Sequence, residues 1–312
     1  MVYLKIKSLH RYPVKSMGGE KLQSIQLTKD GIFGDRYWAI YNLDVGELQG
    51  ARRLPKLLLL KAEYIREPNN DRGKIKITFP DGKTIETDQE GQFQELSDFL
   101  GVNVKLCPLK PLMNAAHYKR AVTSNDSEIR KELGIPDNEK TPDFANLPLA
   151  KLAALKYFVS PPGHYFDVFP LHLITQGALG YMQNKTNNNN FVLERFRPNI
   201  VVENNNSEII EEFSWIDNYV QIASAKIKIE AKTVRCSVPT RQQINIPENK
   251  EVIKSIANMN DRFLGVYASV STTGIIKTAD AFKVEIKTKN ELLNNLESAT
   301  NNFKSGIIKF LS

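Results

Sequence analysis

Strand-length segments that alternate apolar with polar residues, or that are rich in β-branched and aromatic residues, recur along most of this 312-residue chain. In its first part they predict strands at 2–10, 22–28, 36–42, 57–65, 74–79 and 102–107. Turn signals such as Gly-Gly, Asp-Gly and Asn-Asn separate these segments, as is typical of a barrel-like antiparallel module. Beyond residue 170, strands are expected at 198–203, 219–223, 225–231, 264–270 and 282–287. The chain is therefore expected to be predominantly β.

Helices are expected at the periphery, which makes the fold class α+β. Residues 89–100 and 176–186 have a helical pattern, and a further helical stretch lies near 250–258. Apolar residues at three- and four-residue spacing predict an amphipathic helix over 288–312, which packs on its own domain or meets a partner or membrane surface. We expect four units, namely a barrel-like domain at 1–120, a connector with short helices at 121–165, a second domain at 166–287 and the helix at 288–312.

Charge and cysteine content exclude several classes of protein. Lysine and arginine total 42 against 35 aspartate and glutamate residues, a net charge of +7, but the basic residues are scattered and form no nucleic-acid-binding motif. Two cysteines cannot form a disulfide framework, an all-cysteine zinc site or an iron–sulfur cluster. Neither a signal-peptide pattern nor a bilayer-spanning apolar run is found. We expect a cytoplasmic protein that has no transmembrane segment and binds no nucleic acid.

Motifs of several common enzyme classes are missing. The sequence has no Gly-x-Gly-x-x-Gly, Walker loop, His-Glu-x-x-His or Gly-x-Ser-x-Gly. Its four histidines have no ligand-like spacing, and His172, in an apolar run, is interpreted as a core histidine. Nucleotide-fold, zinc-hydrolase and serine-hydrolase functions are therefore poor explanations of this chain.

Two segments of the first domain present cations that suit an anionic ligand. In residues 12–16 (Tyr-Pro-Val-Lys-Ser), a proline fixes the exit of the first strand, and Lys15 and Ser16 offer a charge and a hydroxyl to a phosphate. An ordinary solvated turn is the alternative. In residues 31–38 (Gly-Ile-Phe-Gly-Asp-Arg-Tyr-Trp), the planar guanidinium of Arg36 suits bidentate anion recognition, unless it forms only a structural ion pair with the preceding aspartate.

Two segments of the second domain add a further cation and a thiol. In residues 195–202 (Arg-Phe-Arg-Pro-Asn-Ile-Val-Val), Arg197 and Asn199 offer a charged fork and an amide to one ligand, or else belong to a charged loop before a core strand. In residues 232–240, Cys236 directly follows an arginine. Neighbouring positive charge lowers the pKa of a thiol, and the thiolate binds soft metals or attacks electrophiles.

The alternative for Cys236 is a small, buried hydrophobic residue. Cys107, in the segment Val-Lys-Leu-Cys-Pro, has no comparable polar setting and is interpreted as structural. The two cysteines are thus expected to have different roles.

In their order and spacing, the four segments resemble the MOSC family (molybdenum cofactor sulfurase C-terminal domain) with its N-terminal β-barrel partner domain. The resemblance runs over roughly 1–286 and includes 170–175 (Pro-Leu-His-Leu-Ile-Thr) and 265–267 (Gly-Val-Tyr). The layout is similar to that of the amidoxime-reducing components of mitochondria and their bacterial relatives. The resemblance implies two barrel-like β modules, the MOSC N-terminal β-barrel domain and the MOSC β-barrel, with peripheral helices.

The resemblance also implies a site. Cys236 would bind the molybdenum of a pyranopterin cofactor and act in catalysis together with Arg235 beside the metal. Cofactor contacts are implied for Lys15, Ser16, Arg36, Thr175, Arg197, Asn199, Arg235 and Cys236. A doubly charged phosphate calls for several convergent arginine and lysine donors, and a high-valent metal bound through sulfur takes a soft thiolate.

The implied activity is two-electron reduction of a small N-hydroxylated compound, an amidoxime or a hydroxylamine. With two cysteines the chain cannot ligate a ferredoxin-type cluster, so electrons are expected from a separate donor protein of the reductase, flavodoxin, ferredoxin or cytochrome type. The positive net charge favours an acidic donor. The alternative is a molybdenum cofactor carrier or sulfur-transfer protein with a persulfide on Cys236. Pyridoxal phosphate is not expected, since 312 residues leave no room for a desulfurase domain.

Overall fold

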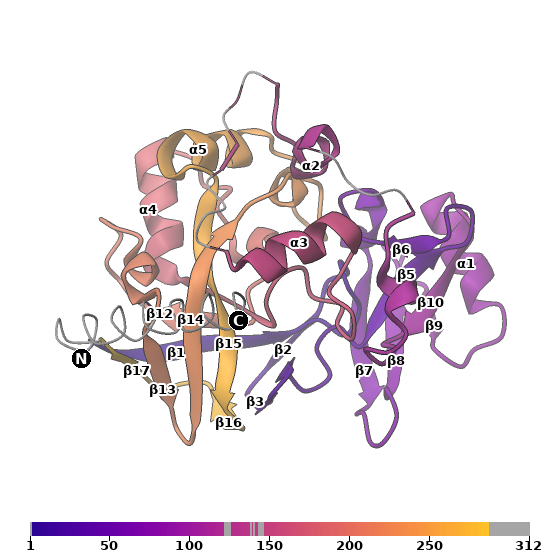
Figure 1. Ribbon diagram of the computed structural model, residues 1–312, viewed down its shortest axis with the longest axis horizontal. Helices are drawn as coiled ribbons and strands as arrows, with labels where there is room; N and C mark the ends of the chain where they lie inside the picture. The colour runs from indigo at the N-terminus through magenta and orange to yellow at the C-terminus, as the bar shows by residue number, and fades with distance from the viewer. Residues whose placement is uncertain (1, 122–125, 138, 140, 143–146, 287–312) are drawn as a thin grey trace, which may run out of the picture.

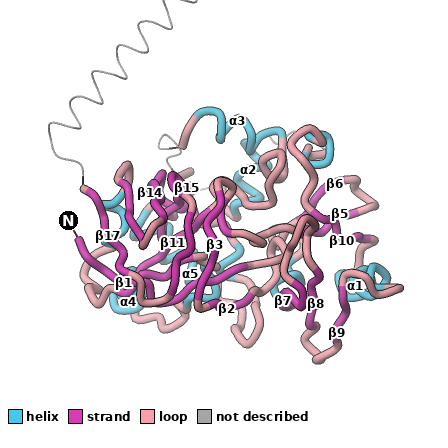
Figure 2. Tube along the Cα trace, turned by 90° about the horizontal axis from the view of Figure 1, so that it is seen from below, coloured by secondary structure: helices cyan, strands magenta, loops and turns pink. Residues whose placement is uncertain are grey.

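Strands dominate the structure and helices lie at its periphery, as expected from the sequence (Figures 1 and 2). It is a computed structural model that describes residues 2–121, 126–137, 139, 141–142 and 147–286. The amphipathic helix expected over 288–312 lies outside the described residues. No helix within the described ranges has both the length and the apolar composition needed to cross a membrane.

A closed barrel of seven strands forms one side of the molecule (Figure 1). Around the barrel the strands follow the order β12 (Ile200–Glu203), β11 (Leu171–Thr175), β15 (Phe263–Thr272), β14 (Ala225–Val234), β13 (Tyr219–Ile222), β17 (Ala281–Glu285) and β1 (Val2–Arg11). Pairing of β1 with β12 closes the barrel, and β2 (Glu20–Leu22) extends the sheet from β1. Neighbouring barrel strands are antiparallel except β11 and β12, which are parallel.

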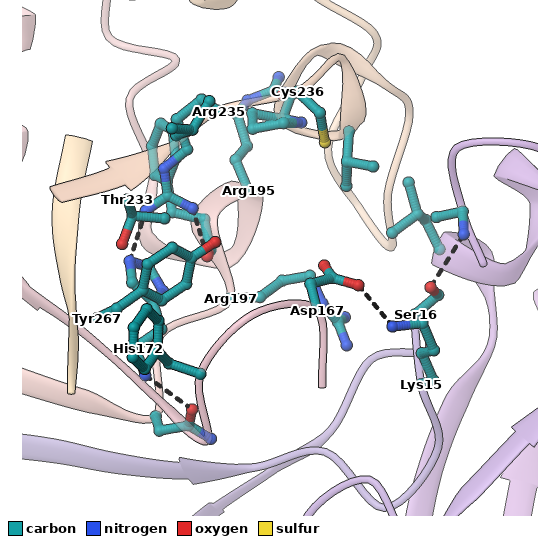
Figure 3. Close-up of a pocket in the computed structure, with 18 of the residues that line it drawn as sticks. Lys15, Ser16, Asp167, His172, Arg195, Arg197, Thr233, Arg235, Cys236 and Tyr267 are labelled. Carbon is teal, nitrogen blue, oxygen red and sulfur yellow. Dashed lines mark hydrogen bonds and ion pairs between the residues drawn. The ribbon is translucent and has the colours of Figure 1, made fainter. Parts of the chain in front are cut away.

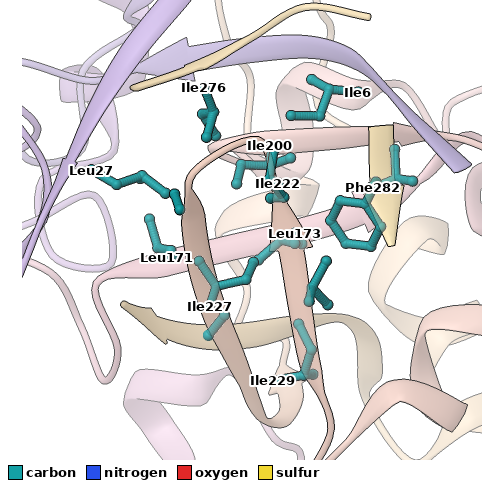
Figure 4. Close-up of a cluster of buried hydrophobic side chains, with 14 of the residues drawn as sticks. Ile6, Leu27, Leu171, Leu173, Ile200, Ile222, Ile227, Ile229, Ile276 and Phe282 are labelled. Carbon is teal, nitrogen blue, oxygen red and sulfur yellow. The ribbon is translucent and has the colours of Figure 1, made fainter. Parts of the chain in front are cut away.

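Alternation along the strands fills the barrel interior. In β14 every second residue is buried, including Ile227 and Ile229. The lysines at the alternate positions, Lys226, Lys228 and Lys232, are partly exposed. These isoleucines pack with Ile6, Leu173 and Phe282 from other strands (Figure 4). Full burial of such a side chain stabilises the fold by about 1.5–3 kcal/mol. The period-two pattern of the sequence therefore specifies which face of each strand forms this core.

The N-terminal module lies beside the barrel and contains two small antiparallel sheets (Figure 1). Its elements are β5 (Trp38–Asn42), β6 (Glu47–Gln49) and β10 (Val104–Pro108) in one sheet, β7 (Lys61–Arg66), β8 (Lys74–Thr78) and β9 (Thr84–Glu86) in the other, and helix α1 (Gln92–Leu100). A third small sheet joins β3 (Ser24–Thr28) to β4 (Gly31–Ile32) and to β16 (Gly274–Lys277) from the end of the described chain. The two parts of the molecule are therefore interlinked.

Four further helices cover the barrel or approach it from the connector (Figures 1 and 2). They are α2 (Asp126–Leu133), α3 (Leu149–Tyr157), α4 (Gln176–Thr186) and α5 (Glu251–Asn260). Helices α4 and α5 share an apolar core with the barrel through residues such as Met182 and Ile256. Leu152 and Leu155 of α3 pack against a separate cluster that contains Val168 and Phe169. Short 3₁₀ helices span Pro55–Leu59, Ala115–Tyr118, Leu193–Phe196, Glu211–Trp215 and Val238–Thr240.

Two segments depart from the sequence-based expectation. The strand expected over 57–65 begins only at Lys61, because Pro55 starts a short helix that buries the following leucines. Strand β11 was not predicted, because all five of its residues are buried and a fully buried strand has no alternating pattern.

The first strand also lies in an unexpected place. The sequence analysis predicts a strand at 2–10 within the domain at 1–120, yet Lys5 pairs with Glu203 of β12, and Val2 pairs with Val284 of β17. The segment that follows β1 then crosses from the barrel to the N-terminal module. Residues 12–16, singled out in the sequence, therefore lie where the two modules meet.

Candidate functional site

A polar cavity of about 120 Å³ brings together residues from all four segments that the sequence analysis singled out (Figure 3). Of the predicted site residues, it is lined by Lys15, Ser16, Arg36, Arg197, Asn199, Arg235 and Cys236. Thr175 is the one predicted residue that is not part of this lining. Residues more than 200 positions apart in the chain thus share one cavity.

Lys15 and Ser16 occupy the wall contributed by the N-terminal module. Ser16 adopts a left-handed backbone conformation (φ 71°), and its Oγ accepts a hydrogen bond of 2.9 Å from the backbone N–H of Ala51. Lys15 Nζ donates to the backbone oxygen of Tyr165 at 2.8 Å and pairs with Asp167 at 2.5 Å. Burial lowers the pKa of Lys15, and the attraction of Asp167 offsets part of this effect. Lys15 is thus a buried cation with one carboxylate partner.

Asp167 carries the negative charge of this wall. Its side chain is 61% exposed, and it lines the polar cavity. Enclosure by the cavity walls acts to raise the pKa of Asp167, but attraction to Lys15, and then to Arg52, lowers it overall. Asp167 is therefore ionised at neutral pH.

Arg36 and Arg197 stack on one aromatic ring. Their guanidinium carbons lie 5.3 Å and 4.3 Å from the ring centre of Tyr12, and each residue has a φ of 53°. Arg36 forms an ion pair with the preceding Asp35, so the structural alternative raised from the sequence is realised. Arg36 nevertheless lines the cavity as well. The ring of Tyr12 thus contacts both Arg36 and Arg197 beside the polar cavity.

Arg197 has an unmet hydrogen-bonding capacity. Its Nη2 is buried and has no hydrogen-bond partner among the described residues. Burial lowers the pKa of Arg197 to about 10. Thr233, also in the lining, has a buried Oγ1 that is likewise unpartnered within the described chain. Because buried polar groups are nearly always paired, these two atoms are available to hydrogen-bond a polar ligand in the cavity.

Arg235 is fixed by the barrel. Its Nε donates to the backbone oxygen of Leu264 at 2.8 Å, and its Nη2 lies 2.5 Å from His172 Nε2 (Figure 3). The pKa of His172 lies well below its usual value, because of burial and then because of Arg235, so the ring is neutral and accepts this hydrogen bond. Gly265 (φ 75°) makes the arrangement possible, since a Cβ there would lie 2.6 Å from His172 Nε2.

Cys236 follows β14 at the point where three cavities meet. It is half-buried and lines the polar cavity, a smaller arginine-lined cavity that includes Arg52, and a third cavity lined largely by leucines. Cys107, by contrast, is buried in β10, and burial raises the pKa of its thiol. The thiol of Cys236 is accessible to a ligand, and that of Cys107 has the structural setting expected for it.

Asn199 and Thr175 support the site from behind. The Oδ1 of Asn199 accepts from the backbone N–H of His172 at 3.2 Å, and its Nδ2 donates to the oxygen of His10 at 3.3 Å. Thr175 caps α4 by accepting from the N–H of Ala178, and its hydroxyl donates to Glu212 at 2.7 Å. Asn199 therefore joins the backbone of His172 to that of His10, and Thr175 fixes the start of α4.

Sequence reasoning missed several lining residues, among them Asp167, His172 and Tyr267. Asp167 stands between apolar residues with no motif around it, so no sequence signal indicated it. His172 is buried, as expected of a core histidine, but it also lines the cavity and holds Arg235. Tyr267 pairs with His172 across β11 and β15, and the Gly-Val-Tyr segment was its only signal. Burial raises the pKa of Tyr267, so its hydroxyl stays protonated.

No group of three or more His, Cys, Asp or Glu side chains suited to hold a metal ion occurs in the part of the chain that the structure describes. The fold and site define a class of protein, namely a predominantly β chain whose two modules enclose a cation-lined cavity that ends at one thiol.

The family assignment agrees with this description. Residues 3–108 match the MOSC N-terminal beta barrel domain, and residues 161–283 match the MOSC domain, a molybdenum-cofactor-binding type of domain. The chain belongs to the MOSC family. Residues 109–160, which include α2 and α3, lie outside both matches.

Solved structures resemble this chain at low sequence identity. The YUAD protein from Bacillus subtilis is 10% identical, with 92% of this chain and 98% of that chain covered and a TM-score of 0.44. YiiM from Geobacillus stearothermophilus is 14% identical, with 39% of this chain and 57% of that chain covered and a TM-score of 0.30. No curated protein matches the sequence. The family assignment therefore depends on the two matched domains.

Proposed function

We propose that this protein is a molybdenum-cofactor-dependent oxidoreductase that reduces N-hydroxylated compounds such as amidoximes and hydroxylamines. The observation that carries the proposal is the unpartnered, buried Nη2 of Arg197 in a cavity that also contains Lys15 and Arg36 and ends at Cys236. A buried cation without a full set of partners is costly, so the cavity suits a ligand that brings negative charge. A phosphate-bearing pterin with a sulfur-bound metal matches both ends of the cavity.

The donor set fits such a cofactor. The residues that would hold its phosphate and ring edges are Lys15, Ser16, Arg36 and Arg197, with Asn199 and Thr175 supporting the backbone around them. Cys236 would bind the metal as a thiolate, with Arg235 next to it. When bound, the cofactor supplies a metal that exchanges two electrons and accepts an oxygen atom.

The remaining chemistry concerns the substrate. Reduction of an N–OH group breaks the N–O bond, consumes two electrons and two protons, and releases water and the amidine or amine. Tyr267 keeps its proton because burial raises its pKa, so its hydroxyl donates a hydrogen bond to the substrate oxygen. Asp167 is ionised and accepts a hydrogen bond from the substrate N–H. Both residues line the polar and the leucine-lined cavities beside Cys236.

Electrons would come from a separate donor protein. Cys107 and Cys236 lie in different modules, so the described chain offers no cysteine cluster for an iron–sulfur centre. A donor of the reductase, flavodoxin, ferredoxin or cytochrome type therefore completes the cycle. The net charge of +7 favours encounter with an acidic donor.

The test begins with protein purified from a host that makes molybdenum cofactor. It should contain molybdenum and a pterin that fluoresces after oxidation, and it should reduce benzamidoxime with an artificial reductant. Changes to groups that only support metal ligands cost about 10–100-fold, so Cys236→Ser, which removes the ligand itself, should lower the rate by more than about a hundredfold.

Cys107→Ser is the matched control, since this thiol is buried away from the cavity, and it should retain activity. Protein that contains neither molybdenum nor pterin, or full activity of Cys236→Ser, would overturn the proposal.

The accessible thiol also supports the alternative role as a cofactor carrier or sulfur-transfer protein, because Cys236 can be reached from three cavities. In that role Cys236 would carry a persulfide. Cyanide treatment of the purified protein would then release thiocyanate, and Cys236→Ser would release none. A metal-loaded protein that is inert toward all N-hydroxylated compounds but activates a molybdenum hydroxylase would favour this role.

A further inference from the structure

The third cavity at Cys236 differs in kind from the polar one. It has a volume of about 150 Å³, and its walls include the apolar side chains Leu133, Leu147, Leu152, Leu155, Val168 and Val234. Its polar lining residues are Asp167, Tyr267, Arg52, Arg120 and Cys236. A leucine-lined cavity of about this volume accommodates a benzene ring.

Polar groups gather at one end of this leucine cavity. Asp167, Tyr267 and Cys236 line both the leucine cavity and the polar cavity, so the two cavities meet at these three residues. Arg52 lies near the same end, since its charge acts on both Asp167 and Tyr267. A molecule in the leucine cavity would therefore place a polar end beside the thiol and an apolar body among the leucines.

The leucines come from the connector. Leu133 ends α2, Leu152 and Leu155 lie on α3, and Leu147 directly precedes that helix. All four lie in residues 109–160, which neither family match covers. Most of the apolar wall of the leucine cavity thus comes from the segment between the two matched domains.

We propose that the leucine cavity binds the apolar body of the substrate and makes the enzyme selective for N-hydroxylated compounds that carry an aryl group or a long alkyl chain. The N–OH end lies at Asp167, Tyr267 and Cys236, and the ring or chain packs on Leu152 and Leu155. This inference rests on the proposed function, because it names the substrate class of the same site.

A purely structural role for these leucines makes a different prediction. Leu152 and Leu155 also pack against Val168 and Phe169, which anchors α3 to the barrel. If anchoring were their only role, truncation would lower stability and would affect aromatic and small substrates equally. Substrate binding by the leucines instead predicts a change in the ratio between such substrates.

Binding to the cofactor-free full chain provides the first readout, because the leucine cavity is built entirely from protein. Calorimetric titration with benzamidoxime should yield a dissociation constant that Leu155→Ala weakens by roughly 15- to 60-fold, as expected for the loss of two to three buried methylene or methyl groups from the contact. Leu179→Ala, a matched change at another half-buried helical leucine, should leave it unchanged.

A filling variant separates binding from stability. Leu155→Trp should exclude benzamidoxime from the cofactor-free protein. In metal-loaded protein it should lower kcat/KM for benzamidoxime at least tenfold relative to acetamidoxime, which lacks the apolar body. Thermal unfolding of each variant identifies any that fail to fold, and Leu152→Ala, in the same wall, provides a second truncation.

The outcomes distinguish the two proposals. Protein that lacks molybdenum but binds benzamidoxime in a Leu155-dependent manner overturns the proposed function alone. Metal-loaded, active protein with benzamidoxime-to-acetamidoxime ratios unchanged in Leu155→Trp and both alanine variants overturns the leucine cavity as the substrate site.

Discussion

The polar cavity and the leucine cavity share Cys236 but are built at very different cost. The polar cavity holds buried cations on strained backbone, with Ser16, Arg36 and Arg197 all at positive φ. The leucine cavity is lined by helix and loop residues such as Leu152 and Leu155, which lie in ordinary α3 geometry. A binding site for a charged group therefore lowers the stability of the fold in a way that a site for an apolar group does not.

For Arg197 the free-energy cost to folding has two parts. A non-glycine residue in the left-handed region costs about 1–2 kcal/mol. The pKa of Arg197 falls from 12.5 to about 10 in the fold. That difference corresponds to about 3 kcal/mol of stability lost while the group is charged. The polar cavity is therefore a place where ligand binding, and not folding, explains the choice of residue.

Among the variants that compare the two cavities, the largest expected effect comes from Arg197→Met. Loss of charge-assisted hydrogen bonds to a phosphate should lower cofactor content tenfold to about a hundredfold, while the cofactor-free protein becomes more stable because a buried, incompletely paired charge is removed. Pterin content and thermal unfolding measure the two effects. Benzamidoxime binding to the cofactor-free leucine cavity should be unaffected, which tests the independence of the cavities.

Arg195→Met is the matched control. The guanidinium of Arg195 is satisfied by backbone oxygens, including those of Pro239 at 2.9 Å and Pro247 at 2.7 Å. Its removal leaves these acceptors unpaired and should destabilise the protein. If both methionine variants destabilised the protein equally, the contrast between a ligand-holding and a structural arginine would be wrong.

A second effect, of at least about 2 kcal/mol, is expected for Gly265→Ala. Alanine is strained at the φ of 75°, and its Cβ would lie 2.6 Å from both His172 Nε2 and the oxygen of Leu173. The variant should unfold at a lower temperature, and its displaced Arg235 should reduce cofactor content. Gly180→Ala, on helix α4 against Ser207, is the control that should be tolerated. An unchanged melting temperature in Gly265→Ala would contradict the role assigned to this contact.

The smallest effect concerns Glu212 behind the polar cavity. Burial raises the pKa of this carboxyl to about 7, and hydrogen bonding from Thr175 opposes the shift. Because the pKa of Glu212 is higher in the folded than in the unfolded state, the stability that this group contributes is fully present below its unfolded-state pKa. That contribution is lost as the pH rises through about 7. Stability should therefore fall by about 1 kcal/mol between pH 6 and pH 8 from this group.

Glu212→Gln should flatten that part of the pH profile in chemical denaturation. A slope identical to that of the unchanged protein would mean that Glu212 does not titrate in this range.

The sequence could single out four segments with unusual polar residues, but the family resemblance, and not the residues alone, brought these segments into one predicted site. A lysine at a strand exit, arginines among aromatic residues and a cysteine beside Arg235 are each informative, and the cavity contains all of them. Asp167 escaped detection because a single carboxylate next to aromatic residues has no distinctive spacing. Its role emerges only from its distance to Lys15.

The leucine cavity was beyond sequence reasoning for a different reason. Leucines at helical spacing, such as Leu152 and Leu155, predict a packed helix face, and whether that face also borders a cavity depends on the facing surface. Strand β11 shows the same limit, since complete burial removes the alternation on which strand prediction depends. The hydrophobic pattern of the sequence thus predicted the amphipathic helices and strands. The fully buried strand β11 and the leucine cavity could be found only in the tertiary structure.

The pairing of β1 with β12 and β17 has a consequence for how the protein is made. Strand β1 leaves the ribosome before its partners, which lie near residues 200 and 281. At about 5–20 residues per second, β1 waits roughly 15–60 s for the last of them. A fragment that begins at residue 161, where the MOSC match begins, lacks β1 and leaves β12 and β17 as open edges. The part of the chain that must fold together is therefore longer than the matched MOSC domain. Separate expression of residues 161–283 should yield aggregating protein.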